Sequence, residues 1–160
     1  MIDQVDGDGG PYSCSKSGGG FVSERLADYP EIVRFPVHWG EMDALGHVNH
    51  VRYIVWFETA RMAMFARLGL TETGDTTMGP ILANVSCDYT APVQWPADVA
   101  VGARIARIGR KSFVTEYGVF VDGETPTLVA RGQAVIVLFN YRDGVTVPIP
   151  DPLREAMEAL

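Results

Sequence analysis

The residues that could carry chemistry gather in one segment, HWGEMDALGHVNHVRYIVWFETAR, which runs from His38 to Arg61. The segment contains all three histidines of the chain and three carboxylates, and its polar half precedes a long apolar half. The apolar half predicts one helix over about residues 49–68, because this stretch lacks Gly and Pro. Asn49 is a suitable N-cap and Gly69 a suitable C-cap. The titratable groups therefore occupy a turn that leads directly into a helix.

This combination of a carboxylate and a helix start suits hydrolysis at a carbonyl group. The reaction needs an activated water or direct carboxylate attack, and it places negative charge on the carbonyl oxygen. The first N–H groups of a helix have no internal partners, and the helix dipole adds positive potential there. A donor aimed in this way lowers the barrier by about 3–4 kcal/mol. Gly46 lets the chain turn tightly before the helix, so one turn can supply both groups.

The same residues also have structural interpretations. Asp is common in turns, so Asp43 can simply stabilise this one, and Glu41 is interpreted as a turn residue rather than a second catalyst. His47 is a candidate general base, set against a role as a turn or pocket-wall residue. His38 is interpreted as a structural residue of a strand. The histidines form no H-x-H or H-x-x-x-H pair, so no metal site is predicted.

The predicted helix has almost no polar face, so we expect it to be buried nearly all round. Glu58 and Arg61 stand three residues apart and can form a buried ion pair that holds the helix in place. Tyr53 is interpreted as a core residue first and as a substrate wall second.

Composition limits the class of protein. The chain has 160 residues, 47% of them apolar, and a net charge of −7, which fits a single globular domain and argues against nucleic-acid binding. No apolar run is long enough to span a membrane, and the acidic start lacks the features of a signal peptide. We expect a cytoplasmic protein with no membrane partner, in which residues 1–28 form a disordered tail and residues 29–160 a single domain.

The rest of the domain is predicted to be a sheet. A first strand, EIVRFPVHW, contains Pro36, which indicates an edge position or a bulge. Short connections separate the later strands and imply an antiparallel meander, and DPLREAMEAL forms a closing helix capped by Asp151. The fold class is α+β, a curved sheet wrapped around one long helix, with some sheet surface meeting another subunit. The four later strands are predicted at Ile81–Tyr89, Asp98–Ile108, Ser112–Val121 and Thr127–Phe139.

WGEMDALGHVNHVRYIVWFETAR, followed by IGRKSF, resembles the hotdog-fold acyl-CoA thioesterases, in the 4-hydroxybenzoyl-CoA thioesterase-like branch. The resemblance covers about residues 31–140 and includes an acidic D-x-D-x-x-G turn, whose first acid is here Glu41. It implies that Asp43 is the general base or nucleophile and that the backbone N–H of His50 is the oxyanion donor. It also implies an active site at a subunit interface, and hence a homodimer or homotetramer.

The resemblance extends to the substrate. It implies hydrolysis of an acyl-CoA thioester to free acid and coenzyme A, with no cofactor besides the coenzyme A of the substrate. The basic turn in RIGRKSF is a candidate site for the phosphates, set against a plain solvated turn. Residues expected in the turn or at the substrate are Gly46, His47, Asn49, Tyr53 and Glu58, and those expected at coenzyme A are Arg110, Lys111 and Ser112.

Two other functions fit the same fold. The first is hydrolysis of acyl chains on acyl carrier protein, which the acidic charge of this chain disfavours because carrier proteins are acidic themselves. The second is a non-catalytic acyl-CoA-binding protein, since a fold alone does not fix a function. The absence of a G-x-S-x-G motif disfavours a serine hydrolase.

Overall fold

The computed structural model describes residues 25–70 and 77–160. It consists of one antiparallel sheet and a long helix, which confirms the predicted α+β class. The sheet order is β1-β3-β4-β5-β2, and the short β6 pairs with β5. The strands are β1 (Glu31–Pro36), β2 (Met78–Tyr89), β3 (Asp98–Ile108), β4 (Ser112–Val121), β5 (Thr127–Asn140) and β6 (Val145–Thr146). The helices are α1 (His50–Arg67) and α2 (Asp151–Glu158), with 3₁₀ turns η1 (Leu26–Asp28) and η2 (Trp39–Glu41).

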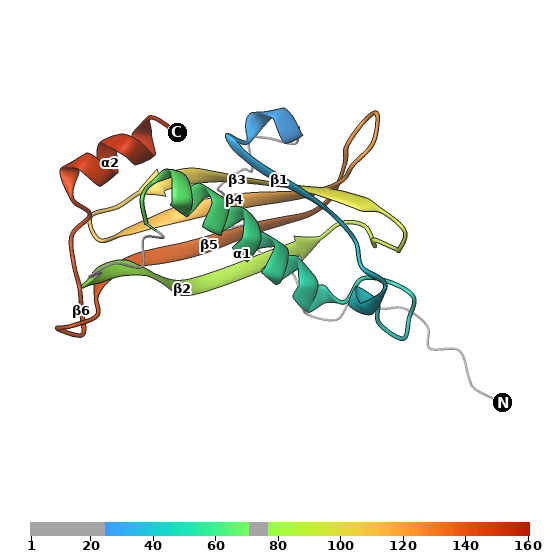
Figure 1. Cartoon of the computed structure of the whole chain (residues 1–160), viewed down its shortest axis with the longest axis horizontal. Coiled ribbons are helices and arrows are strands. Elements are labelled where there is room, and N and C mark those ends of the chain that lie inside the picture. Colours follow the sequence, from blue (N-terminus) through green and yellow to red (C-terminus); the bar gives the residue numbers. More distant parts are fainter. Residues whose placement is uncertain (1–24, 71–76) are drawn as a thin grey trace, which may run out of the picture.

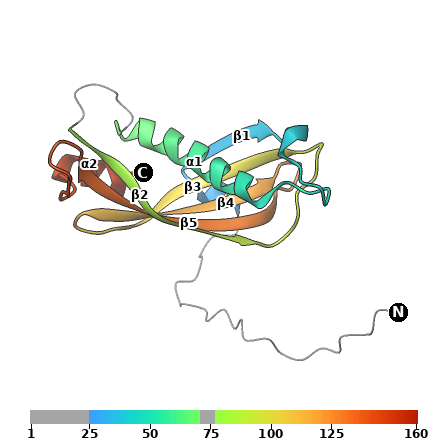
Figure 2. The same cartoon turned by 90° about the horizontal axis from the view of Figure 1, so that it is seen from below.

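Helix α1 crosses one face of the curved sheet, and the two form separate layers (Figures 1 and 2). At one end of the sheet, α2 lies beside the hairpin between β3 and β4, where Arg154 donates to the carbonyl of Gly109 at 2.7 Å. The turn η2 and the start of α1 lie at the opposite end (Figure 1). The N-terminus of α1 therefore sits where β2 ends and β3 begins.

Most predicted boundaries are confirmed, because they depend on local signals. The helix α1 starts after the N-cap Asn49, as predicted. Its C-cap is Leu68, one position before the predicted Gly69, which follows with a φ of 68°. The strand β1 lies at a sheet edge, as Pro36 indicates. The assignment of Asp151 as a cap was wrong by one position. Pro150 is the N-cap of α2, because its extended backbone ends just before the helix, and its own side chain forms no capping hydrogen bond.

The predicted meander is correct for only three of the four later strands. Strands β3, β4 and β5 pair in sequence, but β2 pairs with β5, at the opposite side of the sheet from β3. The connection over residues 90–97 must therefore cross three strand spacings, about 14 Å. Eight residues span this distance easily, and Pro92 and Pro96 cannot donate hydrogen bonds to a strand ladder. The crossing brings this connection beside the start of α1.

The contact between α1 and the sheet is close because one strand residue has no side chain. Phe57 of α1 is fully buried and stacks on Tyr117 of β4, with ring centroids 4.7 Å apart. A Cβ atom at Gly132 of β5 would overlap the ring of Phe57. The absence of a side chain at Gly132 thus fixes how deeply α1 sits in the curved sheet.

One face of α1 is exposed, contrary to the prediction that the helix is buried nearly all round. Val51, Val55 and Met62 are 51%, 43% and 44% exposed, respectively. These three residues, which we call the α1 stripe, recur at a spacing of about one or two helical turns. The prediction failed because the sheet of a single chain covers only one side of the helix.

The predicted tail, residues 1–28, falls mainly on residues 1–24, which lie outside the described residues. Its last part forms η1, and there Leu26 is buried. Together with Tyr29, Leu26 packs on Ala100 and Phe120, on the face of the sheet opposite α1. Part of the apolar outer face that we expected to meet another subunit is therefore covered by the chain itself.

Candidate active site

The turn before α1 holds the Asp43 carboxylate in a fixed orientation. The carbonyl of Asp43 accepts from the N–H of Gly46 at 3.1 Å, and Gly46 has a φ of 79°, in the left-handed region that glycine adopts readily. The carboxylate oxygen Oδ1 accepts from the N–H groups of Leu45 at 2.8 Å and His47 at 3.5 Å. No hydrogen bond to Oδ2 occurs within residues 25–70 and 77–160. One oxygen therefore orients the carboxylate and the other is available for chemistry.

The first turn of α1 leaves one main-chain donor uncommitted. The side chain of Asn49 accepts from the N–H of Val51 at 3.1 Å, which confirms Asn49 as the N-cap. The N–H of Arg52 donates to the carbonyl of Asn49 at 2.9 Å. In the part of the chain that the structure describes, the N–H of His50 donates to no protein atom. This N–H lies at the positive end of the helix dipole and can bind an oxyanion.

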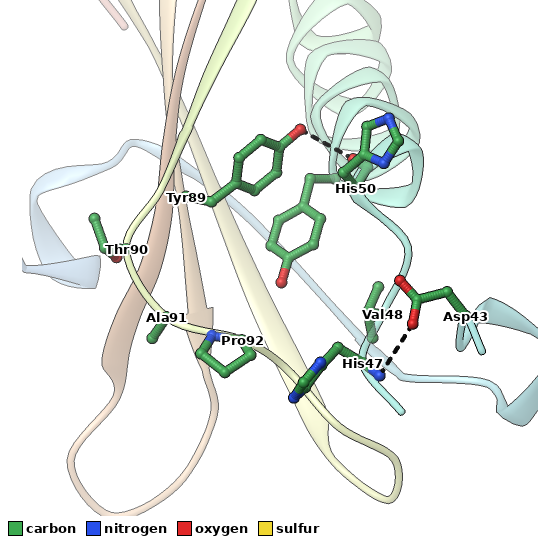
Figure 3. Close-up of a pocket in the computed structure, with 9 residues that line it drawn as sticks. Asp43, His47, Val48, His50, Tyr89, Thr90, Ala91 and Pro92 are labelled. Carbon is green, nitrogen blue, oxygen red and sulfur yellow. Dashed lines mark hydrogen bonds between the residues drawn. The ribbon is translucent and has the colours of Figure 1, made fainter. Parts of the chain in front are cut away.

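Asp43 and His50 line the same pocket, which has a volume of about 350 Å³. This volume is at the lower end of the range typical of small-molecule sites. Figure 3 shows two facing walls: one from the turn and the start of α1, the other from the end of β2 and the connection after it. The lining residues are Asp43, His47, Val48, His50, Tyr53, Tyr89, Thr90, Ala91 and Pro92.

The second wall was missed by sequence reasoning. Tyr89 ends β2, and residues 90–92 begin the connection that crosses the end of the sheet. No motif marks these residues, and their position depends on the pairing of β2 with β5. The closest signal in the sequence is the Pro92 and Pro96 pair, which shows only that a strand has ended.

Of the other residues that we predicted to lie in the turn or to contact substrate, some line the pocket and others do not. His47 and Tyr53 line the pocket, whereas Asn49 acts as a cap. Glu58 lies eight residues beyond His50, about 12 Å along α1, and its side chain is 62% exposed. Its nearest charged partner is the buried Arg61 at 3.9 Å, so the predicted ion pair is buried only on the arginine side. The guanidinium of Arg61 also donates to the hydroxyl of Tyr117 at 3.4 Å.

The basic turn lies far from Asp43 within one chain. Arg110, Lys111 and Ser112 follow β3, whose length separates them from the pocket by about 30 Å. The ammonium of Lys111 donates to the carbonyl of Thr146 at 2.8 Å, which ties this hairpin to β6. Ser112 instead lines a second cavity of about 260 Å³, together with Arg107. The structure thus brings Ser112 and Arg107 together, at the end of the sheet opposite Asp43.

Glu41 is a buried carboxylate that joins the turn to α1. Its Oε2 accepts from the N–H of His38 at 2.8 Å, and its Oε1 accepts from Nε of Arg52 at 3.1 Å and Nε1 of Trp56 at 3.4 Å. His38 lies after β1 and has a 73% exposed side chain, so its prediction as a strand residue was wrong. With its hydrogen bonds directed at the protein, Glu41 has a structural role.

Replacing Glu41 with glutamine is therefore expected to affect stability more than catalysis. The amide leaves the cation of Arg52 without its carboxylate, and we expect the free energy of unfolding to fall by about 2 kcal/mol. Denaturant unfolding measures this change. Glu31→Gln is the matched control, since Glu31 pairs with Arg67 at 3.1 Å near the surface and its loss should cost below about 1 kcal/mol. Equal losses in the two variants would contradict the assigned role.

The described residues form neither a metal site nor a membrane-spanning helix. Within the described residues, no three His, Cys, Asp or Glu side chains are placed to share a metal ion. No helix in the same part of the chain is long and apolar enough to cross a membrane.

The sequence matches the thioesterase-like superfamily over residues 37–157, which is most of the chain. The chain belongs to this superfamily. The crystal structure of the PA5185 protein from Pseudomonas aeruginosa strain PAO1 shares 34% sequence identity, with a TM-score of 0.75 over 84% of this chain and 94% of that one. A thioesterase from Thermus thermophilus, solved with coenzyme A and Zn, shares 31% identity, with a TM-score of 0.71 over 82% and 94% of the two chains.

A more distant relative supports the fold alone. Slr0204, a 1,4-dihydroxy-2-naphthoyl-CoA thioesterase from Synechocystis, is 19% identical, with a TM-score of 0.71 over 81% of this chain and 96% of that one. The superfamily match confirms the resemblance to the hotdog-fold thioesterases, in their 4-hydroxybenzoyl-CoA thioesterase-like branch, and the matching structures confirm the hotdog fold. Family membership supports thioester hydrolysis as the general activity.

Proposed function

We propose that this protein hydrolyses an acyl-CoA thioester, with Asp43 as general base or nucleophile and the N–H of His50 as oxyanion donor. One observation carries the proposal: an oriented carboxylate with a free oxygen and an uncommitted helix N–H line one pocket. The coenzyme A bound to the Thermus thermophilus relative supports the same class of substrate.

In the general-base route, Asp43 accepts a proton from a water molecule as the water oxygen attacks the thioester carbonyl carbon. The carbonyl oxygen becomes negative and accepts a hydrogen bond from the N–H of His50. When the tetrahedral intermediate collapses, the C–S bond breaks and the proton passes from Asp43 to the departing thiolate. In the nucleophilic route, Asp43 attacks the carbonyl carbon itself, the thiolate leaves, and water then hydrolyses the resulting anhydride.

We further propose that the active protein is a homo-oligomer. The 12-residue β2 is a sheet edge with exposed Met78 and Leu82, and the apolar α1 stripe is exposed as well. Large apolar side chains that remain exposed on neighbouring elements mark an interface. In such an assembly, Arg110, Lys111 and Ser112 contribute to coenzyme A binding from a partner chain, because about 30 Å separates them from Asp43 in their own chain. Arg107 lines the same cavity as Ser112 and adds a positive charge there.

Placing a charge in the α1 stripe is expected to dissociate the oligomer. In Val55→Asp, a carboxylate would have to be buried at the interface, which is costly without a partner. Light scattering after size-exclusion chromatography should show the single-chain mass for this variant and a multiple of it for wild type. Val145→Asp is the control, because Val145 of β6 is similarly exposed but lies outside the stripe. A monomeric wild type would overturn the proposed assembly.

A panel of acyl-CoA substrates tests the proposed activity through release of the thiol. Turnover of at least one acyl-CoA is the expected result. Matched acyl chains on acyl carrier protein separate the two thioesterase functions, and the acidic charge of −7 leads us to expect faster turnover of the coenzyme A substrates. Saturable binding of acyl-CoA without thiol release would identify a non-catalytic binding protein instead.

A further inference from the structure

We propose that Tyr89 is a positioning residue, which holds the first turn of α1 so that the N–H of His50 points into the pocket. The inference rests on the proposed hydrolysis, since it assigns a role within that reaction. Tyr89 is the last residue of β2, and its hydroxyl donates to the main-chain carbonyl of His50 at 3.1 Å (Figure 3). The bond joins two segments that are 39 residues apart in the sequence.

The carbonyl of His50 is an effective point at which to fix the oxyanion donor. Residues at a helix end fray readily, because few hydrogen bonds hold them. The cap residue Asn49 fixes the N–H of Val51, but it does not contact the N–H of His50. Among the residues that the structure describes, Tyr89 has the only side chain that bonds to the main chain of His50. This bond therefore limits rotation of the residue that carries the proposed donor.

The Tyr89 side chain is itself well fixed. Its ring meets that of Tyr53 edge-to-face, with centroids 5.1 Å apart. Cys87 lies two residues earlier, on the same face of β2. Burial raises the pKa of the Cys87 thiol to about 11, so this thiol stays protonated at neutral pH and places no negative charge beside Tyr89.

The protonation state of Tyr89 suits the assigned role. The phenol must carry its proton in order to donate to a carbonyl. Burial raises the pKa of Tyr89 to about 12. The hydroxyl thus remains a donor throughout the neutral range.

Tyr89→Phe tests the proposal, because it retains the ring in the pocket wall and removes only the hydroxyl. Tyr141→Phe is a closely matched control. The hydroxyl of Tyr141 donates to the carbonyl of Pro80 at 3.2 Å, near the other end of β2, and Tyr141 is 53% exposed compared with 48% for Tyr89. Both variants lose one bond between a tyrosine and a main-chain carbonyl, but only Tyr89 bonds to the active-site turn.

Two measurements on the full chain separate positioning from general stability. The first is amide hydrogen exchange at Ile54, whose N–H pairs with the carbonyl of His50 within α1. We expect faster exchange in Tyr89→Phe than in wild type and no change in Tyr141→Phe. The second is steady-state kinetics with an accepted acyl-CoA. We expect kcat to fall about tenfold in Tyr89→Phe with little change in KM, and both constants to stay unchanged in Tyr141→Phe.

The outcomes distinguish this proposal from the one it rests on. If both variants match wild type in exchange and in kcat, Tyr89 is not a positioning residue, even though hydrolysis is established. An increase in KM at constant kcat would make Tyr89 a substrate contact and would also overturn the proposal. If wild type turns over no acyl-CoA, the proposed function fails first, and unchanged exchange at Ile54 would separately refute the claim that Tyr89 holds the turn.

Discussion

Replacing Asp43 with asparagine is expected to lower kcat for an accepted acyl-CoA about 100-fold or more, with the fold and oligomer retained. The asparagine side chain keeps an oxygen that can accept from the N–H of Leu45, so the turn should survive the change. It cannot take a proton from water at neutral pH and is a poor nucleophile. Thiol release under saturating substrate measures the effect, and size-exclusion chromatography checks the assembly.

Asp122→Asn is the matched control for this experiment. Asp122 pairs with Arg34 at 3.0 Å near the surface, outside the pocket, so its replacement should leave kcat unchanged. Alanine at position 43 would be a poorer test, because it also removes the hydrogen bond that shapes the turn. Wild-type turnover in Asp43→Asn would refute the catalytic assignment and leave Asp43 as a turn residue.

Gly132→Ala should be the most destabilising Gly→Ala change in the part of the chain that the structure describes. The new Cβ would overlap the ring of Phe57, and it would approach its neighbour more closely than a Cβ at any other glycine there. Phe57 cannot move easily, because it stacks on Tyr117 in a fully buried position. We expect the free energy of unfolding to fall by about 3 kcal/mol, as measured by denaturant unfolding.

Gly123→Ala provides the control, since no atom of the described residues lies within 4 Å of a Cβ at that position. Its effect should stay within about 0.5 kcal/mol. A double-mutant cycle with Phe57→Leu tests the mechanism further. Because leucine removes the ring that meets the new methyl group, the double variant should lose less stability than the sum of the single changes. Additive losses would show that Gly132 acts through something other than contact with Phe57.

The sequence predicted features that depend on short stretches of chain. The acidic turn, the cap at Asn49, the end of the helix before Gly69 and the bounds of β3 and β4 all follow from local signals such as Gly, Asn and strand-forming runs. The two proposed catalytic groups belong to one such stretch. The resemblance of this stretch to the hotdog-fold thioesterases is what named Asp43 and the N–H of His50 before their geometry was known.

Features that depend on distant pairing were not predicted. No local pattern shows that β2 pairs with β5 instead of β3, so the wall containing Tyr89 could not be placed. The exposed α1 stripe was missed for a related reason. Periodicity shows that a side chain favours burial, but it does not show whether the same chain or another one covers it. The basic turn was recognised from its residues. Its distance from Asp43 was not predicted, because that distance depends on how the whole sheet is ordered.

The pairing of β2 with β5 also fixes when the pocket can form during folding. One wall of the pocket comes from the turn and α1, which are synthesised before β2. The other wall is held in place by β2. Among the described residues, residues 78–89 of β2 pair with residues 130–140 of β5 and with no other strand. On the ribosome, chains fold as they emerge, and pairing across such a separation carries a loop-closure cost. The pocket is therefore incomplete until the chain through Asn140 is available, and a substrate can stabilise this protein only late in its folding.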